Sequence, residues 1–361
     1  MLETVTLQDI YRARRAIAGQ IRRTPLLPSD SLTRAVGAPV HLKLEQLQIT
    51  GSFKLRGATN AVLALSPEQQ GKGVVGVSTG NHGRGLAYAA QQAGARCVIC
   101  MSSLVPQNKV EGIEALGAEV RIVGSSQDEA QREVDRLVAE QGMTMLPPFD
   151  HADVIAGQGT IGLELLEDLP ELETCVVPLS GGGLIAGVAR AIKSANPRAR
   201  VIGVTMARGA AMYQSQKAGR PVEVEETASL ADSLGGGIGL DNRYTFAMVR
   251  DLVDDLLLVE EAASLADSLG GGIGLDNRHS FALVRDLVDE TVLVGEDEIA
   301  AGMAHCYWRE QQVVEGAAAV GVAALLAGKV GRAGSHVAVV LSGRNVDMRR
   351  FTAIVAARAD D

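Results

Sequence analysis

The sequence has little positive charge, no long apolar run and few cysteines. Its 361 residues include 34 lysines and arginines against 43 aspartates and glutamates, which gives a net charge of −9. An acidic chain does not suit the phosphate backbone of a nucleic acid, so we expect no nucleic-acid partner. The longest alanine- and glycine-rich run without charge, 316–328, is too short to span a bilayer. The N-terminus has no apolar secretory core, so we expect a cytoplasmic protein without a membrane partner.

The four cysteines and six histidines do not form a metal or redox motif. Cys97 and Cys100 match C-x-x-C in spacing, but 96–101 reads as a strand, and residues three apart on a strand face opposite sides. We therefore expect buried free thiols. The histidines include no pair at the i, i+4 spacing of a helical metal site, and we predict no metal.

Short apolar runs alternate with amphipathic or alanine-rich stretches along the chain. This alternation predicts an α/β protein with largely parallel sheets. With 47% hydrophobic residues, the chain is long enough for one or two domains. The expected strands include 74–77, 96–101, 119–123, 174–178, 200–204, 256–259 and 337–341.

Lys54 stands in an unusual local setting, Ser-Phe-Lys-Leu-Arg-Gly at 52–57, after a turn-forming run. A desolvated lysine beside another cation has a lowered pKa, and its neutral amine is a nucleophile that can form a Schiff base. Most single lysines are solvated surface groups. The prediction of a reactive amine therefore depends on three further segments.

The second segment, 78–83, reads Ser-Thr-Gly-Asn-His-Gly between an apolar strand and an alanine-rich helix. A tight turn that opens a helix presents free backbone N–H groups to an anion such as a substrate carboxylate. The Asn81 amide can also donate to a ring oxygen. The alternative is an ordinary helix cap by Ser78 or Asn81.

The third segment is a glycine turn, Ser-Gly-Gly-Gly-Leu at 180–184, between a strand and a helix. Glycines let the backbone approach a phosphate, and the helix N-terminus adds positive potential. The turn lacks the P-loop lysine and the full G-x-G-x-x-G spacing, so nucleotide binding is not favoured. The alternative is a flexible turn.

The fourth segment, Leu-Ser-Gly-Arg-Asn at 341–345, follows a strand. The hydroxyl of Ser342 at a strand's carboxyl end can meet a ring nitrogen in the crevice where α/β sheets bind ligands. A neutral hydroxyl does not hold a pyridinium proton, which suits elimination more than transamination. The alternative is a plain strand-end turn.

Together and in this order, the four segments resemble the fold-type II pyridoxal phosphate enzymes, which include serine/threonine dehydratases and serine racemase. The resemblance covers nearly the whole chain and is strongest to the hydroxyectoine utilisation dehydratase subfamily. The stretches that carry the subfamily resemblance are 6–15, 51–60, 126–137, 206–212, 230–242 and 341–348.

The resemblance implies a two-domain α/β fold like that of the tryptophan synthase beta chain, with twisted, parallel-rich sheets flanked by helices. It places a large cofactor-binding domain at 1–68 and 148–361 and a small domain at 69–147. Pyridoxal 5'-phosphate would lie between them, and relatives are commonly homodimers.

The resemblance also assigns roles to residues. Lys54 would carry the cofactor and remove the Cα proton, while Thr79 stands where serine racemase has the serine that acts on the opposite face of Cα. Thr79 is bulkier, so racemase activity is not expected. Thr205 replaces the glutamate of a divalent-cation site, which again predicts no metal. The other implied contacts are Phe53 beside the ring, Glu315 near it, Asn81 and Ser342 on its polar atoms, Gly181, Gly182, Gly183 and Leu184 on the phosphate, Ser78, Thr79, Asn81 and His82 on the substrate carboxylate, and one of the loops Gly235/Gly236 or Gly270/Gly271 facing the substrate.

The implied reaction is β-elimination, in which a 3-hydroxy amino acid is dehydrated and deaminated to a 2-oxo acid and ammonia. The subfamily resemblance points to a small amino acid from hydroxyectoine breakdown, such as 3-hydroxy-2,4-diaminobutyrate. Two alternatives stay open. One is a general L-threonine/L-serine ammonia-lyase, and the other is a cofactor-binding scaffold whose catalysis is impaired by a duplication.

That duplication is a tandem repeat at an offset of 35 residues. Segments 225–255 and 260–290 differ at five of 31 aligned positions. We call the units 225–259 and 260–294 copy 1 and copy 2. The family pattern has one such loop-helix-strand unit, and two copies do not make a solenoid. We therefore expect one copy to dock in the sheet and the other to be extruded.

Overall fold

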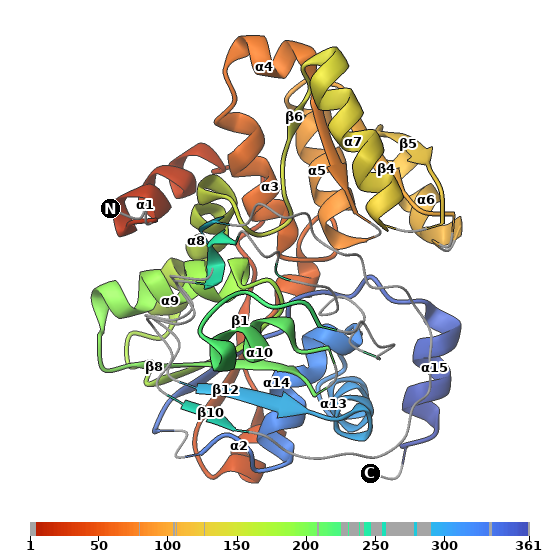
Figure 1. Ribbon diagram of the computed structural model, residues 1–361. Coiled ribbons are helices and arrows are strands. Elements are labelled where there is room, and N and C mark those ends of the chain that lie inside the picture. The colour runs from red at the N-terminus through yellow and green to blue at the C-terminus, as the bar shows by residue number, and fades with distance from the viewer. Residues whose placement is uncertain are drawn as a thin grey trace.

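The computed structural model describes residues 5–78, 80–103, 105, 107–125, 127–207, 209–224, 230, 238, 242–246, 255–257, 278–279, 290–331 and 334–359 (Figure 1). Its helices are α1 Leu7–Ala16, α2 Asp30–Val36, α3 Lys54–Leu63, α4 Pro67–Lys72, α5 Asn81–Gln92, α6 Gln107–Glu114, α7 Gln127–Gln141, α8 Ala152–Asp168, α9 Gly183–Ala195, α10 Ala211–Ala218, α13 Glu296–Trp308, α14 Gly316–Leu326 and α15 Met348–Ala356, with the 3-10 turn η1 Glu45–Leu47. Its strands are β1 Leu26–Pro28, β2 Val40–Lys43, β3 Val74–Val77, β4 Cys97–Met101, β5 Glu119–Ile122, β6 Thr144–Met145, β7 Thr174–Pro178, β8 Arg200–Met206, β9 Arg243–Tyr244, β10 Asp255–Leu257, β11 Arg278–His279, β12 Glu290–Val294 and β13 Val337–Val340.

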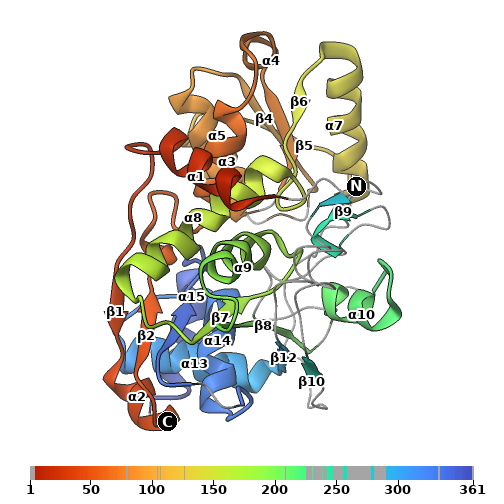
Figure 2. The ribbon, with the colours of Figure 1, turned by 90° about the vertical axis from the view of Figure 1, so that its left-hand side faces the viewer.

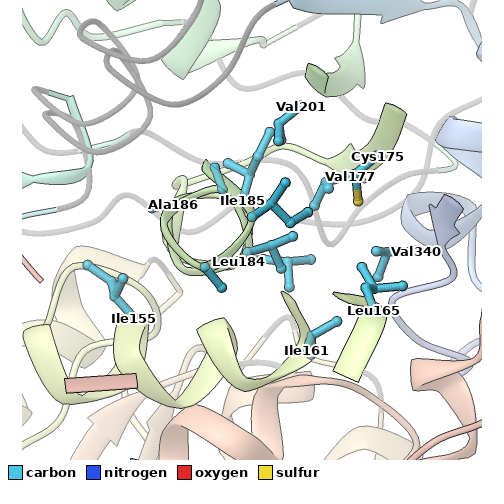
Figure 3. Close-up of a cluster of buried hydrophobic side chains, with 14 of the residues drawn as sticks. Ile155, Ile161, Leu165, Cys175, Val177, Leu184, Ile185, Ala186, Val201 and Val340 are labelled. Carbon is cyan, nitrogen blue, oxygen red and sulfur yellow. The ribbon is translucent and has the colours of Figure 1, made fainter. Parts of the chain in front are cut away.

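The larger sheet has the strand order β1-β2-β13-β7-β8-β12-β10. All neighbouring strands in it are parallel except β1, which runs antiparallel to β2 at one edge. Residues alternate between its faces, so Cys175 and Val177 join one buried cluster while Val176 joins the other. Helices α8 and α9 cover the first face, and Figure 3 shows Leu184 and Ile185 of α9 lying against Val177.

The smaller sheet has the order β5-β4-β3-β6 and is parallel throughout. Helices α3, α5 and α6 pack on one face and α7 on the other. Figure 2 shows α5 and α7 on opposite sides of this sheet, above the large sheet. Cys97 and Cys100 lie in different clusters, one on each face, and both thiols are free and buried. Burial raises the pKa of Cys97 to about 12 and that of Cys100 to about 11. The predicted pair of buried free thiols is confirmed.

The two sheets meet around α3 and α8. Ala58, Ala61 and Val62 of α3 join the apolar cluster of the small sheet, and α3 also packs along α8. Lys54 is the first residue of α3, so the small sheet on one side of this helix and α8 on the other fix its backbone position. The predicted α/β class with parallel-rich sheets and flanking helices is confirmed. The small sheet lies between residues 74 and 145, and the predicted boundaries at 69 and 147 stay predictions.

Within the residues described, no helix is both long and apolar enough to cross a bilayer. In the same part of the chain, no group of three or more histidine, cysteine, aspartate or glutamate side chains is arranged to hold a metal ion.

Candidate active site

Lys54 lies at the first turn of α3 and is partly buried. Its Nζ donates a hydrogen bond to the carbonyl oxygen of Pro148 at 2.7 Å and lies 5.2 Å from the centre of the Phe53 ring. Burial lowers the pKa of Lys54 to about 8, and the carboxylate of Glu315 opposes part of that shift. An amine with this pKa is partly neutral near physiological pH, as a nucleophile or general base requires.

The turn before Lys54 is joined to the end of β13. The N–H of Phe53 donates to the carbonyl oxygen of Ser342 at 3.1 Å, and Ser52 pairs with Gly343 in an isolated antiparallel bridge. A Cβ on Gly343 would lie 2.6 Å from Oε1 of Glu315, so this close approach requires glycine. Ser342 is 3% exposed. Two predicted site residues, Lys54 and Ser342, are thus brought together.

Asn81, Glu315 and Asn345 form a polar network between the two sheets. The Asn81 amide donates to Oε1 of Glu315 at 2.7 Å, and its oxygen accepts from Nδ2 of Asn345 at 2.6 Å. Nδ2 of Asn345 also donates to the carbonyl oxygen of Thr50 at 3.0 Å, and its backbone N–H donates to Glu315 at 3.1 Å. Asn81 is therefore held in a defined orientation near the turn that carries Lys54. Its side-chain N–H, which we predicted to donate to a ring oxygen, donates to Glu315 in this structure.

Ser78 caps the helix that follows it, as the alternative interpretation held. Its hydroxyl oxygen accepts from the N–H groups of Gly83 at 2.9 Å and Gly80 at 3.3 Å. Ser78 is buried at the end of β3, so the cap fixes the turn that opens α5. A role of Ser78 toward a substrate carboxylate stays a prediction.

His82 is buried, and its ring is held by a backbone carbonyl. Its Nε2 lies 2.9 Å from the carbonyl oxygen of Leu146, and burial, together with the nearby Lys54 amine, lowers its pKa to about 4. A neutral ring that donates through Nε2 has a bare lone pair at Nδ1, which has no partner within the described residues. Its side chain therefore cannot donate to a carboxylate. The predicted role of His82 toward a substrate carboxylate stays a prediction.

Some predicted residues cannot be placed. Thr79, Gly235, Gly236, Gly270 and Gly271 lie outside the described residues. Their roles stay predictions.

The glycine turn before α9 fits an anion. Gly182 has φ +88°, which favours glycine, and the N–H groups of Gly182, Gly183 and Leu184 are buried without a hydrogen-bond partner in the described part of the chain. Unpartnered amides at a helix N-terminus are the usual site for a phosphate. The hydroxyls of Ser52 and Thr50 near Lys54 are also buried and unpartnered. The residues present therefore fit a phosphate-bearing cofactor with a polar ring.

The segment 147–150 contacts both Lys54 and the glycine turn, and sequence reasoning missed it. The Pro148 carbonyl holds the Lys54 amine, and the Phe149 ring fills the space above the glycine turn, where a Cβ on Gly181 would lie 2.4 Å from its Cδ1. Asn345 was likewise given no role. The available signal was the pair of prolines before Phe149, which fixes the backbone after a short strand.

A buried ion-pair cluster anchors the base of α3. Arg56 is fully buried and donates to Glu45 at 2.8 and 2.9 Å and to Glu164 at 2.7 and 2.9 Å. Lys43 donates to Glu164 at 2.6 Å and to the carbonyl of Thr24 at 2.7 Å. The charges of two cations and two carboxylates from β2, η1, α3 and α8 thus balance. Arg56, at the centre of this cluster, is two residues after Lys54 in the sequence.

Glu315→Gln should lower the pKa of Lys54 further, because the Glu315 carboxylate stabilises the protonated amine and the neutral amide does not. We expect the inflection in the pH dependence of Lys54 modification, measured on the cofactor-free protein with an amine-specific reagent, to move below about 8. Glu68→Gln, in the exposed ion pair with Lys72 on α4, is the control and should leave the inflection in place. An unchanged inflection in Glu315→Gln would contradict the coupling.

The site geometry can be set beside known proteins. A family model described as pyridoxal-phosphate dependent enzyme matches residues 17–268 and 258–343, two segments that meet within the repeat. A Sinorhizobium fredii protein, provisionally named a threonine dehydratase, is 55% identical over 96% of this chain and 94% of its own. The L-threonine ammonia-lyase of Thermotoga maritima is 39% identical over 97% of this chain and 78% of its own. The structure of maize serine racemase has a TM-score of 0.83 at 31% identity and covers 99% of this chain and 98% of its own.

Proposed function

This chain belongs to the family of pyridoxal-phosphate-dependent enzymes, and we propose that it is an ammonia-lyase that converts a 3-hydroxy amino acid to a 2-oxo acid and ammonia. The observation that carries the proposal is the amine of Lys54, whose pKa burial lowers to about 8 near the Glu315 carboxylate. Its neighbour Phe53 is joined through its backbone N–H to Ser342. Relatives named threonine dehydratase and L-threonine ammonia-lyase, similar over nearly the whole chain, support the same reaction class.

The cofactor of the family is pyridoxal 5'-phosphate. The amides of Gly182, Gly183 and Leu184 would hold its phosphate, and the hydroxyl of Ser342 would face its ring nitrogen. When bound, the conjugated ring supplies a sink for the negative charge that develops at Cα. A neutral serine hydroxyl does not enforce a protonated ring nitrogen, which favours loss of the β-hydroxyl over amino-group transfer.

The chain's own groups then account for proton transfer. Lys54 would accept the Cα proton, since an amine with a pKa of about 8 combines partial deprotonation at neutral pH with useful basicity. The carbonyl of Pro148 and the ring of Phe53 hold that amine in place. The N–H groups at the start of α5, with Ser78 as their cap, would orient the substrate carboxylate.

For the substrate we propose a diamino hydroxy acid such as 3-hydroxy-2,4-diaminobutyrate, on the subfamily resemblance of the segments around 51–60 and 341–348. The second candidate is L-threonine or L-serine, which the names of the relatives favour. The predicted cytoplasmic location and homodimeric state stay predictions.

Measuring kcat/KM for 2-oxo acid formation from the diamino acid, L-threonine and L-serine tests the proposal. We expect the diamino acid to be preferred at least about tenfold, because one well-placed polar contact changes discrimination by this much or more. A preference for threonine would replace the first substrate with the second. No 2-oxo acid from any of the three, with pyridoxal phosphate bound, would instead favour an impaired scaffold.

A further inference from the structure

We propose that the protein builds one functional unit from parts of both repeat copies. Copy 1 supplies the loop segment that docks beside the active site, and copy 2 supplies the strand that completes the large sheet. This arrangement replaces the expectation that one copy docks as a whole and the other is extruded as a whole.

The docked loop residues belong to copy 1. Ile238 is fully buried and Phe246 nearly so in the cluster shared with α8 and α9, and Thr245 is fully buried as well. The Thr245 N–H donates to Oδ1 of Asp150 at 2.9 Å, and the Phe246 carbonyl accepts from Gln216 of α10 at 2.9 Å. Because Asp150 lies two residues after the Pro148 carbonyl that binds Lys54, this loop is coupled directly to the active site.

The loop is also organised internally. The Asn242 side chain donates to the carbonyl of Ile238 at 2.9 Å and accepts from the N–H of Phe246 at 2.6 Å. Further upstream, the Leu230 N–H donates to Glu296 at the start of α13 at 2.6 Å. Copy 1 is therefore anchored at both ends of its loop.

The docked strand belongs to copy 2. β12 pairs with β8 from Glu290↔Ile202 to Val294↔Met206, and its Val292 and Val294 are buried in the cluster of α13 and α14. The equivalent strand of copy 1, β10, lies at the edge beyond β12. It pairs with β12 from Asp255↔Glu290 to Leu257↔Val292, at the repeat offset of 35 residues.

The same offset recurs between β9 and β11, where Arg243 pairs with Arg278 and Tyr244 with His279. Parallel, in-register pairing sets each backbone position beside its counterpart in the other copy, as in stacked identical segments. The surplus copy 1 strand thus joins the sheet edge without displacing β12.

Chain connectivity explains the division. The copy 1 loop follows α10, and the copy 2 strand leads into α13, so each docks through the connection that a single-copy chain would have. Any arrangement of the two copies leaves 35 surplus residues in one connection. The composite places them between Phe246 and Glu290, so the connections to α10 and α13 both keep their single-copy length.

Identical substitutions in the two copies test the proposal. Phe246→Ala should lower the Tm by roughly 5 °C or more, as expected for loss of a buried ring, and kcat/KM at least about tenfold. Phe281→Ala should change the Tm by less than about 2 °C. Likewise, Val292→Asp in the sheet interior should lower the Tm strongly, whereas Leu257→Asp in the edge strand should lower it only slightly. Because Tm is read independently of turnover, a wrong substrate assignment cannot mimic a wrong docking assignment.

Two measurements cover the case in which a variant does not fold. Hydrogen exchange on the unaltered chain should show residues 238–246 protected more than 273–281, and 290–294 more than 255–259. Deletion of 247–281 joins the copy 1 loop to the copy 2 strand and should keep kcat/KM within about threefold. Equal effects of Phe246→Ala and Phe281→Ala, reversed protection, or loss of activity in the deletion would each overturn the composite unit.

Discussion

Replacing Lys54 with methionine will reduce kcat/KM at least about a thousandfold, since the variant loses both its nucleophile and its general base. Borohydride reduction of the protein mixed with pyridoxal phosphate should leave no cofactor attached at position 54. The control is Lys72→Met, because Lys72 is exposed on α4 and pairs with Glu68. Turnover in Lys54→Met within tenfold of the native rate would contradict the central role of this amine.

The same variant should be more stable than the native cofactor-free protein at neutral pH. The pKa of Lys54 falls from 10.5 to about 8 on folding, so between these values the unfolded chain binds more protons than the folded one. Stability therefore rises with pH across that window, and the full penalty applies below about pH 8.

Thermal unfolding of the cofactor-free proteins between pH 7 and 10 measures this penalty. We expect the free energy of unfolding of Lys54→Met to exceed that of the native protein by roughly 2–3 kcal/mol at pH 7, and this difference to shrink toward pH 10. Lys72→Met should show no such convergence. A difference that does not vary with pH would show that packing, rather than the buried amine, separates the two proteins.

The sequence was informative where a function depends on a local motif. Lys54, the turn of Gly182 and Gly183 and the strand-end Ser342 are each recognisable within five or six residues, and the structure places Lys54 beside Ser342. The partner of Lys54 was not predictable, because it is the carbonyl of Pro148, 94 residues away, and every residue has a carbonyl. The burial of His82 was likewise not predictable, because its neighbours in sequence do not reveal it.

The repeat marks another limit of sequence reasoning. Copies that differ at five of 31 aligned positions have nearly equal local preferences, so composition cannot decide which one docks. The decision depends on which copy pairs with β8 and on which loop packs against α8 and α9, which are properties of the folded chain. The same applies to Asn345, whose role arises only when α5 and β13 meet.

Arg56→Met should be the most destabilising single substitution we propose, with a loss of about 3–5 kcal/mol. The guanidinium and both of its carboxylate partners, Glu45 and Glu164, lie in the interior, so removing it leaves two carboxylates buried with Lys43 as their remaining cation. The matched control is Arg136→Met, since Arg136 also contacts two carboxylates, Glu133 and Glu140, but is exposed. Exposed pairs contribute about 0–1 kcal/mol.

The deficit of Arg56→Met should depend on pH in a defined direction. In the native protein, burial raises the pKa of Glu164, but Arg56 and Lys43 more than offset this and hold it below 4.5. Its stabilisation is therefore present above pH 4.5 and lost as pH falls through the lowered pKa. Without Arg56, the largest cause that lowers the pKa of Glu164 is gone and burial raises it, so protonation of Glu164 lessens the destabilisation of the variant as the pH falls.

Denaturant unfolding at pH 7 and pH 5 tests both parts of this argument, and the gap between Arg56→Met and the native protein should narrow at pH 5. Arg56→Met/Glu164→Gln should recover part of the loss, because one unpaired carboxylate is removed with the cation. Affinity for pyridoxal phosphate should also fall in Arg56→Met, since the cluster fixes the first turn of α3 that carries Lys54. A variant as stable as Arg136→Met at both pH values would mean that the cluster does not anchor the active-site helix.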